Sequence, residues 1–326
     1  MKSDLCRKPG GHLLRFFERH PILVDIIAVL GCSSSSLIIR QSTAPSVVTA
    51  TWRLLWTVLL LTPVVWGRKN VRSELLSLPR RSVFLSAVSG VFLAIHFLLW
   101  FESLRHTSIA SATVLVATEV IWVAIGYRVF LKGRLGPKAV AAILITLLGS
   151  ALIAYSDSRT AGESLFGDML ALTAAIAFCV NTLIGRVVRE KTSTSVYTYI
   201  AYVFCALTLG LITLCSGESM TAYGWNAVVI GLLLAVLCTV LGHSCYSWCL
   251  KYFSPAFVSA TKLCQPVVAS LAAAVLLREF PVPLQIVGGL VVLAGVIFYS
   301  YIEIRKEKTV PGGNASACET DTEREV

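Results

Sequence analysis

The sequence predicts an all-α membrane protein of ten transmembrane helices, arranged as two inverted five-helix repeats. Three observations predict it: the composition, a series of apolar runs, and a match of the chain with itself. Of 326 residues, 56% are hydrophobic and only 14% are charged, and the mean hydropathy is +0.76. A soluble domain carries about 25% charged residues, so this composition excludes a soluble enzyme. It also excludes a disordered chain, which needs low hydrophobicity.

Ten apolar runs, each bounded by turn or charge signals, are long enough to cross a bilayer as helices of about 20 residues. They cover residues 21–39, 46–66, 82–104, 108–131, 137–155, 168–188, 195–215, 225–250, 256–277 and 284–302. The short connections favour antiparallel neighbours. We expect a cytoplasmic N-terminal segment (1–20), an external linker (156–167) and a disordered cytoplasmic tail (303–326).

Basic residues set the orientation of these spans. With the N-terminus inside, 22 of the 28 Lys and Arg residues lie in inside segments, four lie in outside loops, and Arg53 and Lys262 lie within spans. This split predicts a multi-pass protein of the plasma membrane with both termini in the cytoplasm. The net charge of +10 forms no basic stripe for a phosphate backbone, so no nucleic-acid partner is expected.

A shift of 146 residues superposes the first half of the chain on the second without a gap. Arg40 then matches Arg186, Ser108 matches Ser254 and Gly149 matches Gly295, and every predicted span lands on another. The two repeats are 21–155 (helices 1–5) and 168–302 (helices 6–10). Because five is odd, the second repeat is inverted in the membrane. Inverted repeats are typical of secondary transporters, whose site lies near the midplane where the halves meet.

Several short segments resemble one family. In the second half these are 254–261 (SPAFVSAT), 265–269 (QPVVA), 276–279 (LLRE) and 288–295 (GGLVVLAG), and the first half has 33–40, 50–53 (ATWR), 107–111 (TSIAS), 130–132 (FLK) and 147–149 (LLG). They are similar to an EamA-type transporter of the drug/metabolite transporter superfamily, over about residues 20–302. The resemblance implies a ten-helix carrier, often an exporter of amino acids, other metabolites or toxic compounds.

This chain departs from the family pattern in its first half. Glu119 and Val120 occupy the place of Gln265 and Pro266, and Gly133 occupies the place of Glu279. Pro266 removes a backbone donor, so it is expected to act as a hinge in span 9. Span 4 has Val120 at the equivalent position and is expected to be straighter.

Glu119 is the most informative candidate, because it lies about ten residues, or roughly 15 Å, into span 4. A charge at that depth costs several kcal/mol unless it is paired, hydrated or protonated. The functional interpretation is a carboxylate that couples transport to a proton or binds a cation. The structural alternatives are an ion pair with Arg53 or a neutral, hydrogen-bonded acid.

Three further charged or polar residues lie within spans. Arg53 in span 2 could bind a substrate carboxylate in a bidentate manner, or it could pair with Glu119 or Glu102. Lys262 and Gln265 share a face of span 9, and Gln265 is the repeat equivalent of Glu119. Lys262 is also close enough to the inner end to extend its amine into the water.

A second set of candidates could line a central cavity. His96 and Trp100 lie one turn apart in span 3, and His243 and Tyr246 lie in span 8, its repeat equivalent. Aromatic side chains with a few polar groups suit an amphipathic organic ligand, although such stripes also serve as packing. Asn181 in span 6 is equivalent to Ser35, and it serves either close helix packing or substrate contact. No metal site and no cofactor are expected.

These patterns favour a secondary transporter of a small organic solute, such as an amino acid, a metabolite or an amphipathic drug-like compound, working by alternating access. Export is favoured through the resemblance. No hydrolase triad, Walker loop or zinc-protease motif occurs, so an enzyme is not expected. The alternatives are a membrane sensor or interaction protein without transport, and a membrane-embedded enzyme. Expected partners are the solute, the lipid bilayer and a coupling proton, and a homodimer stays open.

The charge split generates a topology prediction. Single cysteines introduced into the 40–45, 156–167 and 216–224 loops are expected to react with an impermeant thiol reagent applied to intact cells. Cysteines introduced at 67–81 and 186–194 are expected to react only after lysis, because these segments carry the inside charges. Labelling of the second group before lysis would overturn the orientation.

Overall fold

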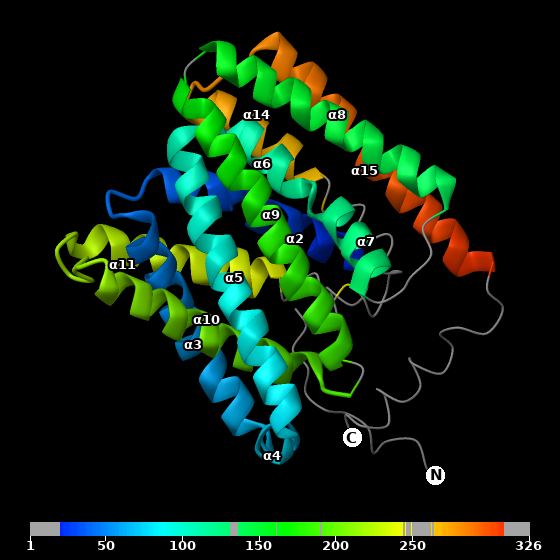
Figure 1. Cartoon of the computed structure of the whole chain (residues 1–326). Coiled ribbons are helices and arrows are strands. Elements are labelled where there is room, and N and C mark those ends of the chain that lie inside the picture. Colours follow the sequence, from blue (N-terminus) through cyan, green and yellow to red (C-terminus); the bar gives the residue numbers. More distant parts are fainter. Residues whose placement is uncertain are drawn as a thin grey trace.

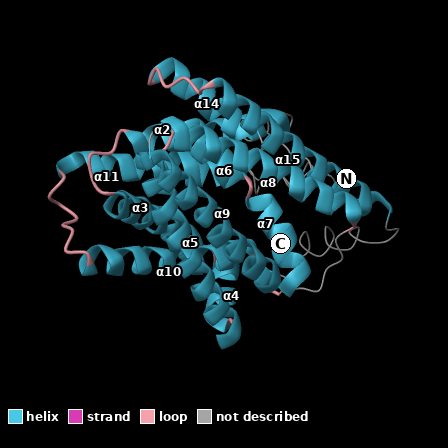
Figure 2. Ribbon diagram, turned by 45° about the horizontal axis from the view of Figure 1, so that its top comes forward, coloured by secondary structure: helices cyan, strands magenta, loops and turns pink. Residues whose placement is uncertain are grey.

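The computed structural model describes residues 20–130, 136–160, 162–189, 191–243, 245, 249, 262 and 264–309, and all regular structure in these residues is helical. Figures 1 and 2 show the helices joined by short loops. The helices are α2 (Pro21–Arg40), α3 (Ser46–Gly67), α4 (Lys69–Ser77), α5 (Arg80–His106), α6 (Ile109–Ala117), α7 (Glu119–Phe130), α8 (Pro137–Thr160), α9 (Gly162–Arg189), α10 (Thr194–Cys215), α11 (Gly224–Leu233), the π-helix η1 (Leu234–His243), α14 (Cys264–Leu276) and α15 (Pro283–Thr309).

The predicted all-α membrane fold is confirmed. Within the described residues, six helical stretches are long and apolar enough to cross a bilayer: Pro21–Arg40, Ser46–Gly67, Arg80–His106, Leu165–Arg189, Thr194–Cys215 and Gly224–Gly242. Four shorter apolar stretches lie at the places of the other four predicted spans: Ile109–Val123, Pro137–Ile153, Cys264–Leu276 and Pro283–Tyr299. The short α4 was not expected; it lies in the connection after α3, and its Glu74 accepts a hydrogen bond from the backbone N–H of Ser193 (2.6 Å).

The packing of the helices repeats when the two halves of the chain are exchanged. Helix α5 packs on α9, and the equivalent η1 packs on α2; α10 packs on α5, and the equivalent α3 packs on α11. Likewise α7 packs on α9, and the equivalent α14 packs on α2. Two further contacts, α3 with α10 and α8 with α15, join each helix to its own equivalent. The structure therefore has the internal symmetry that the 146-residue shift indicates.

The contact between α8 and α15 shows how the two equivalent helices are oriented relative to each other. A Cβ atom on Gly149 would lie 2.7 Å from the backbone N of Val292, and one on Gly295 would lie 2.9 Å from the backbone N of Thr146. These two contacts are equivalent under the shift, and they run in opposite directions along the two helices. The helices are thus antiparallel, as an inverted repeat requires, and they lie side by side in Figure 1. Glycine permits this approach because it has no side chain.

The fourth span is divided at Thr118 into α6 and α7. That this span is straighter than span 9 stays a prediction, because most of the first part of span 9 lies outside the described residues. The Thr118 hydroxyl donates to the Leu115 carbonyl (2.6 Å), and its backbone N–H donates to the same carbonyl (3.2 Å). This local bonding competes with the regular helical pattern. Pro266 is buried in the first turn of α14, and residues 250–261 and 263 before it lie outside the described part, so its hinge role stays a prediction.

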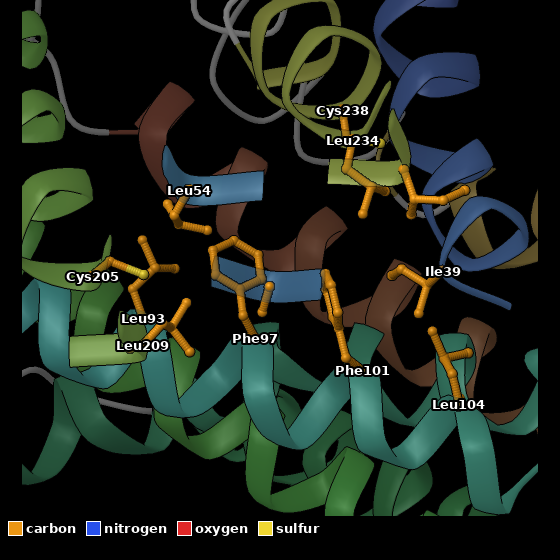
Figure 3. Close-up of a cluster of buried hydrophobic side chains, with 14 of the residues drawn as sticks. Ile39, Leu54, Leu93, Phe97, Phe101, Leu104, Cys205, Leu209, Leu234 and Cys238 are labelled. Atoms are coloured by element: carbon orange, nitrogen blue, oxygen red, sulfur yellow. The ribbon is translucent and has the colours of Figure 1, made fainter. Parts of the chain in front are cut away.

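The largest apolar cluster lies between α3, α5, α10, α11 and η1, and α2 and α14 also contribute to it. Figure 3 shows Phe97, Phe101 and Leu104 projecting from α5 toward Leu54 and Ile39. Five of these elements are repeat equivalents: α3 corresponds to α10, and α5 corresponds to α11 and η1 together. The cluster therefore surrounds the place where the halves of the chain meet.

The glycine contact between α8 and α15 predicts opposite effects for two substitutions. Gly149→Ala is expected to destabilise the protein by about 1–3 kcal/mol, because the new methyl group meets the backbone of α15. Gly210→Ala in α10 is the matched control: nothing lies within 4 Å of its added Cβ, and alanine is the better helix former by up to about 1 kcal/mol. Thermal unfolding in detergent measures both. An equal shift of the midpoint for the two variants would contradict the antiparallel contact.

Candidate functional site

Arg53 lies at the centre of the apolar cluster. It is the seventh residue after the start of α3, and only 2% of its surface is exposed. The guanidinium carbon lies 4.4 Å from the Phe97 ring centroid and 5.9 Å from that of Phe101. Such cation–π contacts stabilise a cation in an apolar place. They do not use its N–H groups, however, and the buried Nε and Nη1 have no hydrogen-bond partner among the residues that the structure describes.

The ion pairs considered for Arg53 are not formed within the described residues. Glu102 instead bonds His106 one turn away on α5 (3.1 Å). Glu119 has no ion pair with Arg53 there either. Among the described residues, therefore, no fixed counter-ion accompanies the buried charge of Arg53.

His96 and Trp100 lie on one face of α5, as the one-turn spacing predicts, next to Phe97 and Phe101, which contact Arg53 of α3. His96 Nδ1 lies 2.9 Å from the Ala174 carbonyl. Because a carbonyl only accepts, Nδ1 must donate, which fixes the ring against α9. The ring stacks on Trp100 (centroids 5.9 Å apart) and contacts Phe178 (4.8 Å). The indole Nε1 of Trp100 is a second buried donor without a partner, so two residues with unpaired donors flank the Phe97–Phe101 face.

Asn181 is hydrogen-bonded to residues of two neighbouring helices. Its amide nitrogen donates to Ser89 Oγ (2.7 Å) and to the Ser89 carbonyl (3.2 Å). The Tyr197 hydroxyl lies 2.5 Å from Ser89 Oγ and donates to the Asn181 carbonyl (3.2 Å). These bonds join α5, α9 and α10. Of the two interpretations that the sequence leaves open for Asn181, the geometry favours close helix packing.

Glu119 lies in a different region, at the first residue of α7, and is half-buried. It makes no hydrogen bond or ion pair in the described part of the chain. Lys262 acts on its carboxylate electrostatically, and Gln265 follows Lys262 by one turn. The side chain of His243, and Tyr246 as a whole, lie outside the described residues. The candidates thus fall into two regions, one around Arg53 with His96 and Trp100, and one around Glu119 with Lys262.

Sequence reasoning missed a polar network at the end of the bundle where α5 ends. Arg40 donates to the Thr107 carbonyl (2.5 Å) and pairs with Glu279 (3.5 Å). Glu279 also accepts from the backbone N–H of Ile109 (2.5 Å), the first residue of α6. The turn that carries Glu279 places Arg278 at φ 57°, in the left-handed region. The network joins helices of the first half to a turn of the second. The sequence signal for it lies in the repeat: Arg40 matches another arginine, Arg186, whereas Glu279 matches Gly133.

A pocket of about 220 Å³ lies beside this network. Its lining comes from the end of α2, the start of α3, the loop between them and the end of α5: Ile39, Arg40, Ser42, Ala44, Ser46, Thr49, Phe101, Leu104 and Arg105. Ser46 Oγ is a further buried polar atom without a hydrogen-bond partner. Within the described residues, no group of three or more His, Cys, Asp or Glu side chains could hold a metal ion.

Known proteins resemble the chain along most of its length. An "uncharacterized transporter" of Archaeoglobus fulgidus is 29% identical over 251 residues, which are 74% of this chain and 83% of the relative. A "probable amino-acid metabolite efflux pump" of Salmonella typhimurium is 25% identical over 214 residues, 62% of this chain and 71% of the relative. One crystal structure, 19% identical, superposes with a TM-score of 0.59 over 87% of this chain and 98% of its own, which shows a shared fold.

The model of the EamA-like transporter family matches twice, at residues 21–155 and 165–301. The two matches cover most of the chain, and each contains five of the predicted spans. The resemblance inferred from short motifs is thereby confirmed. The chain belongs to the EamA-like transporter family.

Proposed function

We propose that the protein is a secondary transporter that moves a small organic solute across the plasma membrane by alternating access, with both termini in the cytoplasm. The observation that carries the proposal is the buried Arg53 with its unpaired N–H donors. It lies among α3, α5, α10 and α11, which are two pairs of repeat equivalents. Carriers with inverted repeats bind solutes at such an interface. Unpaired buried donors are costly, and a solute can satisfy them.

Export is the proposed direction, and an amino acid or related metabolite is the proposed solute. The support is the relative from Salmonella typhimurium, which is named a probable amino-acid metabolite efflux pump. The test is flux of a metabolite panel into and out of proteoliposomes, with and without an imposed pH gradient. Saturable flux of at least one solute is expected. Its absence for the whole panel, in protein of verified folding, would refute the function.

Alternating access requires a barrier on each side of the site. The Arg40–Glu279 pair joins α2 of the first half to the turn after α14 of the second, and the side chains are only 30% and 25% exposed. Glu279 further holds the start of α6. By the charge split this end faces outward, so the network acts as an outer latch. In the repeat register Arg40 and Glu279 correspond to Arg186 and Gly133. Because glycine has no carboxylate, this Arg–Glu pair has no equivalent pair at those two positions.

Glu279→Gln tests the latch, because glutamine keeps an oxygen for the Ile109 N–H but loses the ion pair. The outer end is expected to open more often, by up to about fivefold, since a partly exposed pair contributes up to about 1 kcal/mol. The readout is the rate at which an impermeant maleimide labels Ser46→Cys in the pocket, with the exposed Cys215 and Cys264 replaced by Ser.

Arg40→Gln in the same background is expected to raise the labelling rate as well. Arg186→Gln is the matched control, because it removes the equivalent charge at the opposite end, and it is expected to leave the rate unchanged. An unchanged rate in Glu279→Gln, or equal acceleration by Arg186→Gln, would show that the pair does not close this end.

Glu119 is the proposed coupling group. It is an acid within the fourth span, and it has no ion pair in the described residues. In Glu119→Gln the side chain keeps its shape and hydrogen bonding but cannot release a proton. The variant is therefore expected to fold normally, to lose flux driven by a pH gradient, and to retain at most slow exchange. Glu119→Asp is expected to keep partial activity.

The measurement is solute flux in proteoliposomes against an imposed pH gradient, with thermal unfolding as the check on folding. Gradient-driven flux that persists in Glu119→Gln would exclude this role, and so would wild-type flux indifferent to the gradient. An ion pair with Arg53 predicts the reverse: a poorly folded Glu119→Gln variant that a change at Arg53 partly rescues.

A further inference from the structure

The pocket at the latch end has a chemical character that alternating access does not explain. Two arginines, Arg40 and Arg105, lie at its lining, and its other polar groups are hydroxyls of Ser42, Ser46 and Thr49. Among the described residues no acidic side chain lines it, and Glu279 beside it is paired with Arg40. A concave surface that carries positive charge concentrates anions, and the Ser46 hydroxyl has no hydrogen-bond partner among the described residues.

Phe101 connects this pocket to Arg53. Its ring lines the pocket, and the ring centroid lies 5.9 Å from the Arg53 guanidinium carbon. The side chain is fully buried and packs edge-on against Trp100 (centroids 5.7 Å apart). A movement of this one aromatic side chain would therefore bring the pocket and the buried cation into contact.

Arg53 itself is suited to a single negative charge. Its guanidinium is buried without a counter-ion in the described structure, so an arriving anion restores a balance that the protein lacks. The ring of Phe97 contacts the guanidinium carbon, whereas Nε and Nη1 remain without partners. A carboxylate accepts from such planar N–H groups. One buried cation in an aromatic surrounding matches a monoanion better than a doubly charged phosphate, whose second charge would stay unpaired.

We propose that the transported solute carries a carboxylate that binds Arg53, and that the pocket with Arg40 and Arg105 is the vestibule through which this anion passes once Phe101 moves. The proposal rests on the transport function proposed above and names the chemical class of its solute. It assigns three separate tasks: attraction at the vestibule, a barrier at Phe101 and binding at Arg53.

The test uses matched pairs of solutes in proteoliposomes that contain the full-length protein. Each pair is an amino acid or small carboxylic acid and its carboxamide, which has nearly the same shape but no charge on that group; phosphate monoesters form a third arm. Wild-type protein is expected to transport at least one acid at least tenfold faster than its amide and than the phosphate ester. Thermal unfolding gives a second readout, because the acid and not the amide should raise the midpoint.

Two substitutions at Arg53 separate charge from structure. Arg53→Gln is expected to reduce acid flux at least tenfold and to make acid and amide equal, whereas Arg53→Lys keeps the charge and should retain part of the preference. If Arg53→Gln does not fold, the wild-type acid-to-amide ratio and the Lys variant decide the outcome. A folded Arg53→Gln variant that still prefers the acid would overturn the proposal.

A separate experiment tests the pocket as a vestibule. Arg105→Gln is expected to raise the KM for the acid severalfold with little change in maximal flux, and the effect should shrink at high salt because the attraction is long-ranged. Arg80→Gln, which removes an exposed charge from the opposite end of the same helix, is the matched control and should change neither quantity. Equal effects of the two variants would overturn the vestibule.

The possible failures can be told apart. Flux of neutral or cationic solutes without any preference for acids would overturn the carboxylate assignment and leave the transport function standing. Faster flux of phosphate monoesters would replace the carboxylate by a phosphate and overturn the class named here. Absence of flux for every solute would remove the transport function, and this inference with it.

Discussion

The hydrocarbon core of a bilayer cannot hydrogen-bond to the chain, and this constraint determines most of the structure. Every buried polar group needs a partner within the protein, and the hydroxyl side chains in the spans find one in their own helix, at carbonyls one turn back: Ser33 to Val29, Thr51 to Val47, Thr57 to Arg53 and Thr146 to Ala142. Against this background the unpaired donors of Arg53 and Trp100 stand out. The hydroxyls just named are satisfied within their own helices, whereas Nε and Nη1 of Arg53 have no partner among the described residues, and the proposed solute site rests on this contrast.

The unpaired donors of Arg53 and Trp100 lie where the two symmetry-related halves of the chain meet. The positions at which the two halves differ in sequence distinguish one membrane face from the other. Exchange of the two halves preserves the packing of the helices, so a perfectly symmetric chain would behave alike at both membrane faces. Two sequence positions break that equality. Glu119 stands where the second half has Gln265, and Glu279 stands where the first half has Gly133. One difference gives the fourth span an acid where the ninth has an amide, and the other leaves the Arg40–Glu279 pair without an equivalent pair at Arg186 and Gly133.

Much of the fold followed from the sequence, because apolar length, charge asymmetry and the 146-residue repeat are properties of the chain alone. The gathering of His96 and Trp100 also followed, since a one-turn spacing fixes a common helix face. What could not be predicted depends on partners far away in the sequence. The packing role of Asn181 requires Ser89 and Tyr197, and the isolation of Arg53 depends on which acids come near it. The division of the fourth span at Thr118 rests on a local hydroxyl bond that competes with the apolar pattern.

The interleaved packing of the two halves has a consequence for biosynthesis. Helix α8 has its glycine contact with α15, α3 packs on α10, and α5 packs on α9 and α10. The first five spans are therefore made well before their main partners leave the ribosome. Until then, the small-residue faces that α15 and α9 later cover are open to lipid or to assisting membrane factors. The last span packs on the fifth, so assembly of this protein is completed only when its C-terminal helix is inserted. Until then, the inserted first half lacks the helices with which it forms the core.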